Sequence, residues 1–245
     1  MLSTLGVLLA IVPSAALLAF FYWKDRYEPE PYGHILAAVA LGALATVPIL
    51  CAQEALAWSV GSDWLLIGGL PARLFEAGVM AAVVEEAIKW MLFAAVIYRW
   101  RELDEPMDGV VYGVALALGF ATVENVMFIR HAGEGALTLG LLRALFSVPA
   151  HALFGGAMGS FFGRAKLGGG LLGGADVTPR QRKLRLALAF AVPCVYHFGY
   201  DGLLLTLRRH EDLMFGVVGG LSIVLWIFVL RRVDHALADS PFKDP

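Results

Sequence analysis

Val83-Val84-Glu85-Glu86-Ala87-Ile88-Lys89-Trp90 places two adjacent carboxylates and a lysine inside an apolar run from about Leu74 to Ile97. A run of this length is typical of a membrane-spanning helix. Because a charged side chain at the centre of a bilayer costs roughly 2.5–3.5 kcal/mol on insertion scales, such residues face protein or water. Lys89 follows Glu85 by four residues and Glu86 by three, so it can pair with either on one helix face. One ion pair would serve packing alone, whereas the second glutamate leaves a net negative charge that favours a functional site.

The composition of the whole chain is that of a polytopic membrane protein. Hydrophobic residues make up 59% of its 245 residues and charged residues only 16%, against about 25% charged residues in soluble domains. The formal net charge of −2 indicates no nucleic-acid partner, and the hydrophobic composition makes the lipid bilayer the expected surroundings. Residues 1–10 include no basic residue, so we expect a retained first span rather than a cleaved signal peptide.

Hydropathy predicts an all-α bundle of seven membrane spans. The spans are expected at residues 3–23, 33–52, 73–98, 109–129, 137–163, 185–207 and 213–230. The stretch 53–71 is predicted to be a loop with a short interfacial helix at Ala55–Val60, and an eighth span there is the alternative. The prolines of the charged connector Lys24–Pro31 separate the first two spans.

Basic residues near the span ends predict the orientation. With the N-terminus outside, thirteen lysines and arginines lie on the inner side and five, including Arg143, on the outer side. The positive-inside rule therefore favours an outer N-terminus and an inner C-terminus. We expect one integral-membrane domain over residues 1–245, with its core at 73–207 and a flexible, glycine-rich cytoplasmic loop at 164–184.

Four consecutive spans carry polar residues near their midpoints, and the first, second and seventh spans carry none comparable. The residues are Glu85, Glu86 and Lys89 in the third span, Glu124 and Asn125 in the stretch that begins at Phe120 in the fourth, His151 in the fifth, and His197 and Asp201 in the sixth. At a rise of 1.5 Å per residue, the two histidines and the carboxylates of Glu85 and Glu124 lie roughly 18–22 Å from one end of their spans, near one plane of a hydrocarbon core about 30 Å thick. A common depth on neighbouring helices predicts one assembled site.

Backbone features accompany the two histidines. Pro149 precedes His151 by two residues and Pro193 precedes His197 by four, so both helices are expected to open near their histidine. Glycines follow at steps of four over Gly155–Gly163, which predicts a face of small residues where another helix approaches closely.

This set of side chains suits peptide hydrolysis without a covalent intermediate. A carboxylate in a partly dry site takes a proton from water, and a histidine orients that water or protonates the leaving amine. The alternative is a zinc ion with an open water position, held by Glu85, Glu124, His151 and His197. The chain contains no HExxH, GxSxG or GxGD motif, so a serine, aspartyl or standard zincin mechanism is not expected. From the sequence we favour a mechanism without a metal ion or other cofactor.

In their order on successive helices, these residues resemble the PrsW family of intramembrane proteases, within the wider CAAX-protease and bacteriocin-processing (Abi) superfamily. The matching motifs are Glu85-Glu86-x-x-Lys89, Phe120-x-x-x-Glu124-Asn125, His151 and His197-x-x-x-Asp201, together with the connector Asp25–Pro31. The resemblance covers about residues 20–205. It departs from the prenyl-protein branch at Glu124, where that branch has a histidine, and at Asp201, where that branch has an asparagine.

The resemblance implies an endopeptidase of the bacterial plasma membrane that makes the first cut in a single-pass anti-sigma factor. It also implies that Glu85 is the base that activates water, with Glu86 in support. The other expected roles are ionisation control by Glu86 and Lys89, completion of the water site by Glu124 and His151, oxyanion stabilisation by His197 and Asp201, and support by Phe120 and Asn125.

Two other classes of function stay open from the residues alone. A chain of glutamates and histidines also serves as a proton relay in a carrier or channel, although the internal repeat common in carriers is not evident here. A catalytically inert scaffold for a partner helix is the third alternative, and the complete set of charged motif residues disfavours it.

Overall fold

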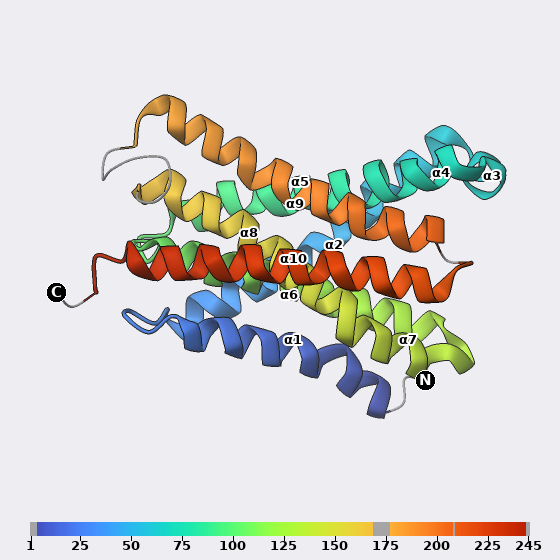
Figure 1. The fold of residues 1–245 in the computed structure, drawn as a ribbon, viewed down its shortest axis with the longest axis horizontal. Helices are drawn as coiled ribbons and strands as arrows, with labels where there is room; N and C mark the ends of the chain where they lie inside the picture. Colours follow the sequence, from blue (N-terminus) through green and yellow to red (C-terminus); the bar gives the residue numbers. More distant parts are fainter. Residues whose placement is uncertain (1–3, 169–176, 208, 244–245) are drawn as a thin grey trace.

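Over the residues it describes, 4–168, 177–207 and 209–243, the computed structural model folds into seven helical passes that lie side by side, without strands (Figure 1). The passes are α1 (Thr4–Lys24), α2 (Tyr32–Val60), a composite of α4 (Gly69–Phe75), η1 (Glu76–Val83) and α5 (Val84–Ala95), α6 (Pro106–His131), a composite of α7 (Ala136–Leu142), η4 (Arg143–Ser147) and α8 (Val148–Leu167), α9 (Pro179–Leu207) and α10 (Glu211–Ala238). Short segments α3 (Ser62–Ile67), η2 (Ile97–Arg99) and η3 (Gly133–Gly135) lie between passes. The predicted all-α polytopic bundle is confirmed.

Six of the described passes are long and apolar enough to cross a membrane. They are Leu5–Lys24, Tyr32–Val60, Pro106–His131, Gly133–Leu167, Pro179–Leu207 and Asp212–Ala238. The remaining pass, 69–95, is less apolar because it carries Arg73, Glu76, Glu85, Glu86 and Lys89. α1 begins at the end of the bundle opposite to the end where α10 finishes, as an odd number of crossings requires (Figure 1). The orientation of this bundle across the membrane stays a prediction.

The stretch 53–71 folds differently from the predicted loop. α2 continues through Val60 and ends at Gly61, whose φ of 84° lies in the left-handed region that favours glycine. Residues 55–60 are therefore the last turns of α2 rather than a separate interfacial helix, because no helix-breaking residue occurs between Pro48 and Gly61. α3 has six residues, too few for an eighth span.

The connection between α8 and α9 is shorter than the predicted loop at 164–184. α8 ends at Leu167, before Gly168 with a φ of 94°, and α9 begins at Pro179. Helix enters the predicted loop from both sides, and the two helices are joined where the buried Arg185 guanidinium donates a hydrogen bond to the carbonyl oxygen of the buried Arg164. Residues 169–176, which hold most of the predicted glycine linker, lie outside the described residues.

α6 lies between α2 and α8, and every residue from Pro106 to Ala121 is buried. On the α8 side, a Cβ placed on Gly159 would lie 1.7 Å from the carbonyl oxygen of Gly109. On the α2 side, a Cβ placed on Gly119 would lie 2.0 Å from the carbonyl oxygen of Val39. Only glycine permits such approaches, so the predicted small-residue face of α8 is confirmed and its partner is α6.

Replacing Gly159 with alanine is expected to lower the thermal unfolding midpoint of the detergent-solubilised protein, because the methyl group forces α6 and α8 apart. Overpacking of this kind costs roughly 1–3 kcal/mol, and each kcal/mol corresponds to roughly 2–4 °C for a chain of this size. The control is Gly219→Ala on α10, where a Cβ meets nothing within 4 Å. An unchanged midpoint for Gly159→Ala would contradict the close contact.

Candidate active site

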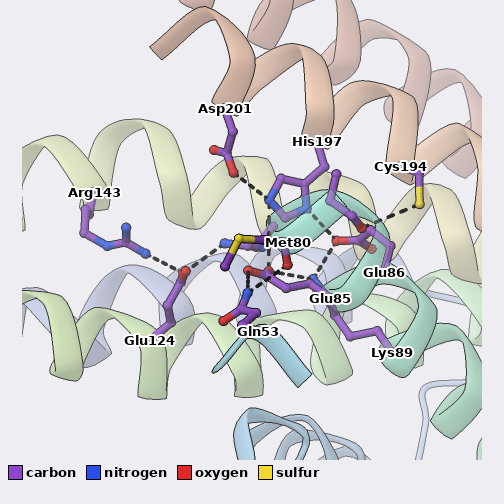
Figure 2. Close-up of polar contacts among 12 residues, drawn as sticks. Gln53, Met80, Glu85, Glu86, Lys89, Glu124, Arg143, Cys194, His197 and Asp201 are labelled. Carbon is purple, nitrogen blue, oxygen red and sulfur yellow. Dashed lines mark hydrogen bonds and ion pairs between the residues drawn. The ribbon is translucent and has the colours of Figure 1, made fainter. Parts of the chain in front are cut away.

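Polar side chains from four passes converge inside the bundle, as Figure 2 shows. They are Glu85, Glu86 and Lys89 on α5, Glu124 on α6, His151 on α8, and His197 and Asp201 on α9. The structure thus brings the two histidines, Glu85 and Glu124, which the sequence places at one depth, into one network with the other three.

Lys89 is the positive centre of one half of this network. Its Nζ donates a hydrogen bond to Oε1 of Glu86 at 2.6 Å and lies 3.7 Å from Oε2 of Glu85. It also lies 4.6 Å from the centroid of the Phe120 ring on α6, within range of a cation–π interaction. The three charged side chains are at most 5% exposed, so this cluster is shielded from water and lipid alike.

His197 connects the glutamates of α5 to Asp201. Its Nδ1 lies 2.9 Å from Oε1 of Glu86, and its Nε2 lies 3.2 Å from Oδ2 of Asp201, one turn further along α9. The imidazole ring stacks on Phe154 with a centroid distance of 4.8 Å. Because carboxylates face both ring nitrogens, the ring is held in one orientation, and its doubly protonated form donates to both.

Glu124 is the centre of the other half. Its Oε2 accepts a hydrogen bond from the Arg143 guanidinium at 2.5 Å and lies 3.1 Å from Nε2 of His151. Arg143 also donates from Nε to Oδ1 of Asn125 at 2.5 Å. The Phe120 ring packs edge-on against the His151 ring, with centroids 5.5 Å apart. The two expected supporting residues, Phe120 and Asn125, thus contact the histidine and the arginine that flank Glu124.

Arg143 and Gln53 are members of this network that sequence reasoning missed. The sequence places Arg143 among the basic residues at the outer span ends, whereas the structure pairs it with Glu124 (Figure 2). Gln53 falls in the stretch predicted to be a loop. Its Nε2 donates to Oε1 of Glu85 at 3.3 Å and to the carbonyl oxygen of Met80 at 3.0 Å. The sequence feature that could have placed Gln53 in α2 is the absence of a helix-breaking residue between Pro48 and Gly61.

Two π-helical segments set the faces that these helices present to the network. A spacing of eight residues, as between Arg143 and His151, is about 80° off one face of an α-helix. η4 inserts an extra residue into this interval, so the two side chains are brought close to a spacing of two full turns and both reach Glu124. η1 ends at Val83, two residues before Glu85, and the Met80 carbonyl oxygen within it accepts the hydrogen bond from Gln53.

The expected opening near the histidines occurs at one of the two prolines. Pro149 lies in the first turn of α8, immediately after the widened turn of η4. Pro193 lies inside α9, which stays α-helical from Pro179 to Leu207, so the predicted opening there is wrong. A proline removes one hydrogen bond, and the surrounding helices hold α9 in place without a break.

A cavity of about 620 Å³ borders the network. Its polar wall contains Glu85, Glu124, Arg143, His151, His197 and Asp201. Apolar side chains such as Ile49, Phe128 and Leu204 line much of the remainder. Ligand cavities are typically about 300–1,000 Å³, so this one has room for a short stretch of extended polypeptide beside the charged groups.

A group of three buried donors, two of which line the cavity, fits a metal ion. Glu85, Glu86 and His151 each offer one ligand atom, and these three atoms lie within 4.8 Å of one another. Glu85 Oε2, Glu86 Oε2 and His151 Nδ1 are buried and form no hydrogen bond within the described part of the chain. Carboxylate oxygens and imidazole nitrogens are ligands that zinc accepts.

Two members of the zinc set expected from the sequence, Glu124 and His197, lie outside this group of three. Oε2 of Glu124 is shared by Arg143 and His151, and both ring nitrogens of His197 face carboxylates. Glu85 and His151 belong to both sets, and Glu86 replaces the other two.

Comparison with known proteins identifies the family. Residues 30–230 match the family model described as "PrsW family intramembrane metalloprotease". The chain belongs to the PrsW family. The resemblance drawn from its motifs is therefore confirmed.

Curated PrsW relatives align with almost the whole chain. "Protease PrsW" of Geobacillus kaustophilus is 35% identical over 226 residues, which are 92% of this chain and 89% of the relative. "Protease PrsW" of Oceanobacillus iheyensis is 34% identical over 236 residues, covering 96% and 97%. "Protease PrsW" of Bacillus subtilis is 34% identical over 227 residues, covering 92% and 93%. No solved structure matches the chain.

As a member of the PrsW family, the chain is a membrane-embedded peptidase and a multi-pass bacterial membrane protein. Its substrate is a protein, and its surroundings are a membrane. Membership of a protease family favours a hydrolase over the carrier and the scaffold that the residues alone left open. The family description is that of a metalloprotease, and the group of Glu85, Glu86 and His151 fits a metal ion.

Replacing Lys89 with methionine is expected to destabilise the protein strongly, because Glu85 and Glu86 would then lie buried without their cation. Removing one partner of a buried ion pair costs about 3–5 kcal/mol, or roughly 10 °C in the thermal unfolding midpoint. The double variant Lys89→Met/Glu86→Gln should recover part of this loss because it removes one uncompensated charge. A Lys89→Met variant as stable as the wild type, measured in detergent, would contradict this role for Lys89.

Proposed function

We propose that this chain hydrolyses a peptide bond of a single-pass membrane protein, using a water molecule activated by Glu85. One observation carries the proposal: Oε2 of Glu85 is buried, forms no hydrogen bond with the described residues, and belongs to a side chain that borders the cavity beside His151. A carboxylate that is fixed in place but not saturated with donors can take a proton from a water molecule at the substrate.

Neighbouring side chains fix Glu85 for this role. Gln53 donates to Oε1 and is itself tied to the carbonyl oxygen of Met80. Lys89 lies 3.7 Å from Oε2 of Glu85 but pairs more closely with Glu86, at 2.6 Å. Lys89 therefore offsets one of the two negative charges and leaves Oε2 of Glu85 without a hydrogen bond from the described residues.

His151 is placed to handle the proton that the leaving amine needs. Its Nε2 faces Glu124 at 3.1 Å, and its Nδ1 is buried without a hydrogen bond among the described residues. With the Nε2 proton directed at Glu124, Nδ1 accepts a proton and passes it on to the amine. The Arg143 guanidinium donates a hydrogen bond to Oε2 of Glu124, which fixes this carboxylate and with it the orientation of the histidine.

Arg143 and His197 supply the positive charge for the oxyanion that develops on the peptide carbonyl. Both border the cavity, and the guanidinium has five donors in a fixed plane. The sequence assigns this task to His197 together with Asp201. A carboxylate does not itself stabilise an oxyanion, so we assign Asp201 the orienting of His197 through their 3.2 Å contact.

Glu85, Glu86 and His151 are the residues that would hold the metal ion of a metalloprotease. The chemistry that a divalent metal ion supplies at such a site is Lewis-acid activation of water and of the peptide carbonyl. The metal-free reaction favoured from the sequence uses the same side chains in other roles, since Glu85 and His151 then carry protons instead of holding an ion.

The substrate that we propose is a single-pass anti-sigma factor of the bacterial plasma membrane, by similarity of the motifs to the PrsW family. The cavity lies among membrane passes, where an unwound peptide loses its helical hydrogen bonds. Such a segment is tolerated in a bilayer only where protein or water replaces these bonds. The polar wall of the cavity offers replacements, which supports a substrate that enters from the membrane.

Glu85→Gln is expected to abolish cleavage and leave the protein folded, because the amide keeps the shape of the side chain but cannot take a proton. General bases contribute about 10²–10⁴-fold to rates. Two strains with the wild type or Glu85→Gln at equal abundance would be compared for a single-pass protein shortened near its outer membrane boundary.

The control for that comparison is Glu54→Gln, which removes an exposed carboxylate next to Gln53 and should leave cleavage unchanged. Retained cleavage with Glu85→Gln would place the base elsewhere. The absence of any shortened membrane protein, at rest and under envelope stress, would contradict the proposed substrate class.

Zinc binding by the purified protein is expected to lose one equivalent in His151→Ala and to persist in His197→Ala, because carboxylates occupy both ring nitrogens of His197. Elemental analysis after gel filtration measures the zinc retained by each variant. Loss of zinc in His197→Ala with retention in His151→Ala would contradict the ligand group, and a wild type that retains no zinc would support the metal-free reaction.

A further inference from the structure

A second cluster of buried carboxylates lies far from the proposed active site, at the start of α6 and on the connector between α1 and α2. Asp25 is 1% exposed and Glu30 3%, while Glu105 and Asp108 are fully buried. Asp108 precedes Glu124 by sixteen residues on the same helix, which corresponds to about 24 Å along its axis. The cluster is therefore distinct from the network around Glu85.

Three of these carboxylates converge on one point. Asp25, Glu105 and Asp108 each offer one ligand atom, and the three atoms lie within 4.8 Å of one another. Glu105 and Asp108 have a local explanation, since they form a capping box at the start of α6. Asp25 has none, because it comes from the connector and brings a third carboxylate to the same place.

Little in the surroundings compensates for the charge of this cluster. Asp108 Oδ2 accepts hydrogen bonds from the backbone N–H groups of Asp104 and Glu105, and Glu30 accepts one from the Tyr112 hydroxyl. Both oxygens of Asp25 are buried, and no cationic side chain or hydroxyl group of the described chain donates a hydrogen bond to them.

No lysine, arginine or histidine within the described ranges forms an ion pair with the cluster. Lys166 on α8 is directed instead to the carbonyl oxygen of Trp100, at 2.5 Å. Either protons or a cation must therefore neutralise the cluster.

We propose that Asp25, Glu105 and Asp108 bind a hard divalent cation of the Mg²⁺, Mn²⁺ and Ca²⁺ class, which fastens the first connector to the start of α6. The donors are all carboxylate oxygens, the ligands that these ions prefer. Ligands on opposite sides of a Ca²⁺ ion lie about 4.6–5.2 Å apart, so one ion can reach all three atoms at the separation present here. A shared proton joins two carboxylates, whereas a cation joins three.

The effect of such an ion would fall on stability rather than on the reaction. The connector leads into α2, and α2 packs closely on α6 at Gly119. An ion that joins the connector to α6 therefore resists separation of these two helices. It contributes no group to the cavity, because none of its three ligands lines that cavity.

The test uses the purified full-length chain in detergent, treated with a chelator and then exchanged into chelator-free buffer. Thermal unfolding is recorded without cation and with Mg²⁺, Mn²⁺ or Ca²⁺ at millimolar concentration. At least one ion is expected to raise the wild-type midpoint by roughly 5 °C, the scale of stabilisation when a ligand well above its Kd binds only the folded state. Binding of Mn²⁺ to the wild type, followed by electron paramagnetic resonance, reports the same ion without the need for a variant.

Asp25→Asn is expected to lose the cation-dependent rise, since it replaces a ligand that no other group holds. Two controls should keep it: Glu28→Gln, an exposed carboxylate on the same connector, and Glu85→Gln, which alters only the distant network. Failure of all three ions to bind the wild type or raise its midpoint would overturn the proposal and leave protons as the neutralising species. A rise that persists in Asp25→Asn, or that disappears in Glu85→Gln, would overturn it as well.

Discussion

A lysine buried together with two glutamates is the constraint on which the rest of the site depends. Lys89 offsets only one of the two glutamate charges and lipid offsets none, so other passes must bring further partners to them. α9 brings His197 to Glu86, and α6 brings the Phe120 ring to Lys89. The charged stretch of α5 thus determines which helices surround it.

The glycine contacts of α6 turn that requirement into a fixed geometry. α6 approaches α8 at Gly159 and α2 at Gly119 so closely that the three helices cannot slide past one another without a clash. Glu124 on α6, His151 on α8 and Gln53 on α2 are therefore held in register with Glu85. The chemistry proposed here needs one unsaturated carboxylate oxygen beside one free imidazole nitrogen, and this packing is what keeps both in the wall of one cavity.

The sequence alone predicts much of this arrangement, for physical reasons. Hydropathy locates the passes because the bilayer demands long apolar helices, and the cost of intramembrane charge marks Glu85, Glu86, Lys89 and Glu124 as site candidates. Arg143 escapes the same reasoning because a basic residue near a span end also serves as a membrane anchor, and a π-helical turn, invisible to periodicity, rotates it towards Glu124. The burial of Asp25 could not be predicted either, since a carboxylate in a charged loop is expected to be solvated. Its burial follows only from how the connector packs on α6.

The central claim is that this chain, by itself, hydrolyses a membrane-embedded peptide at the Glu85 site. The most direct test is to reconstitute the purified protein in liposomes with a purified single-pass membrane protein and to determine the masses of the products. The account predicts two fragments whose masses add up to the substrate plus one water, with the cut in or beside the hydrophobic segment. Substrate that stays intact beside folded protein, with and without added zinc, for each of the single-pass proteins offered, would contradict it.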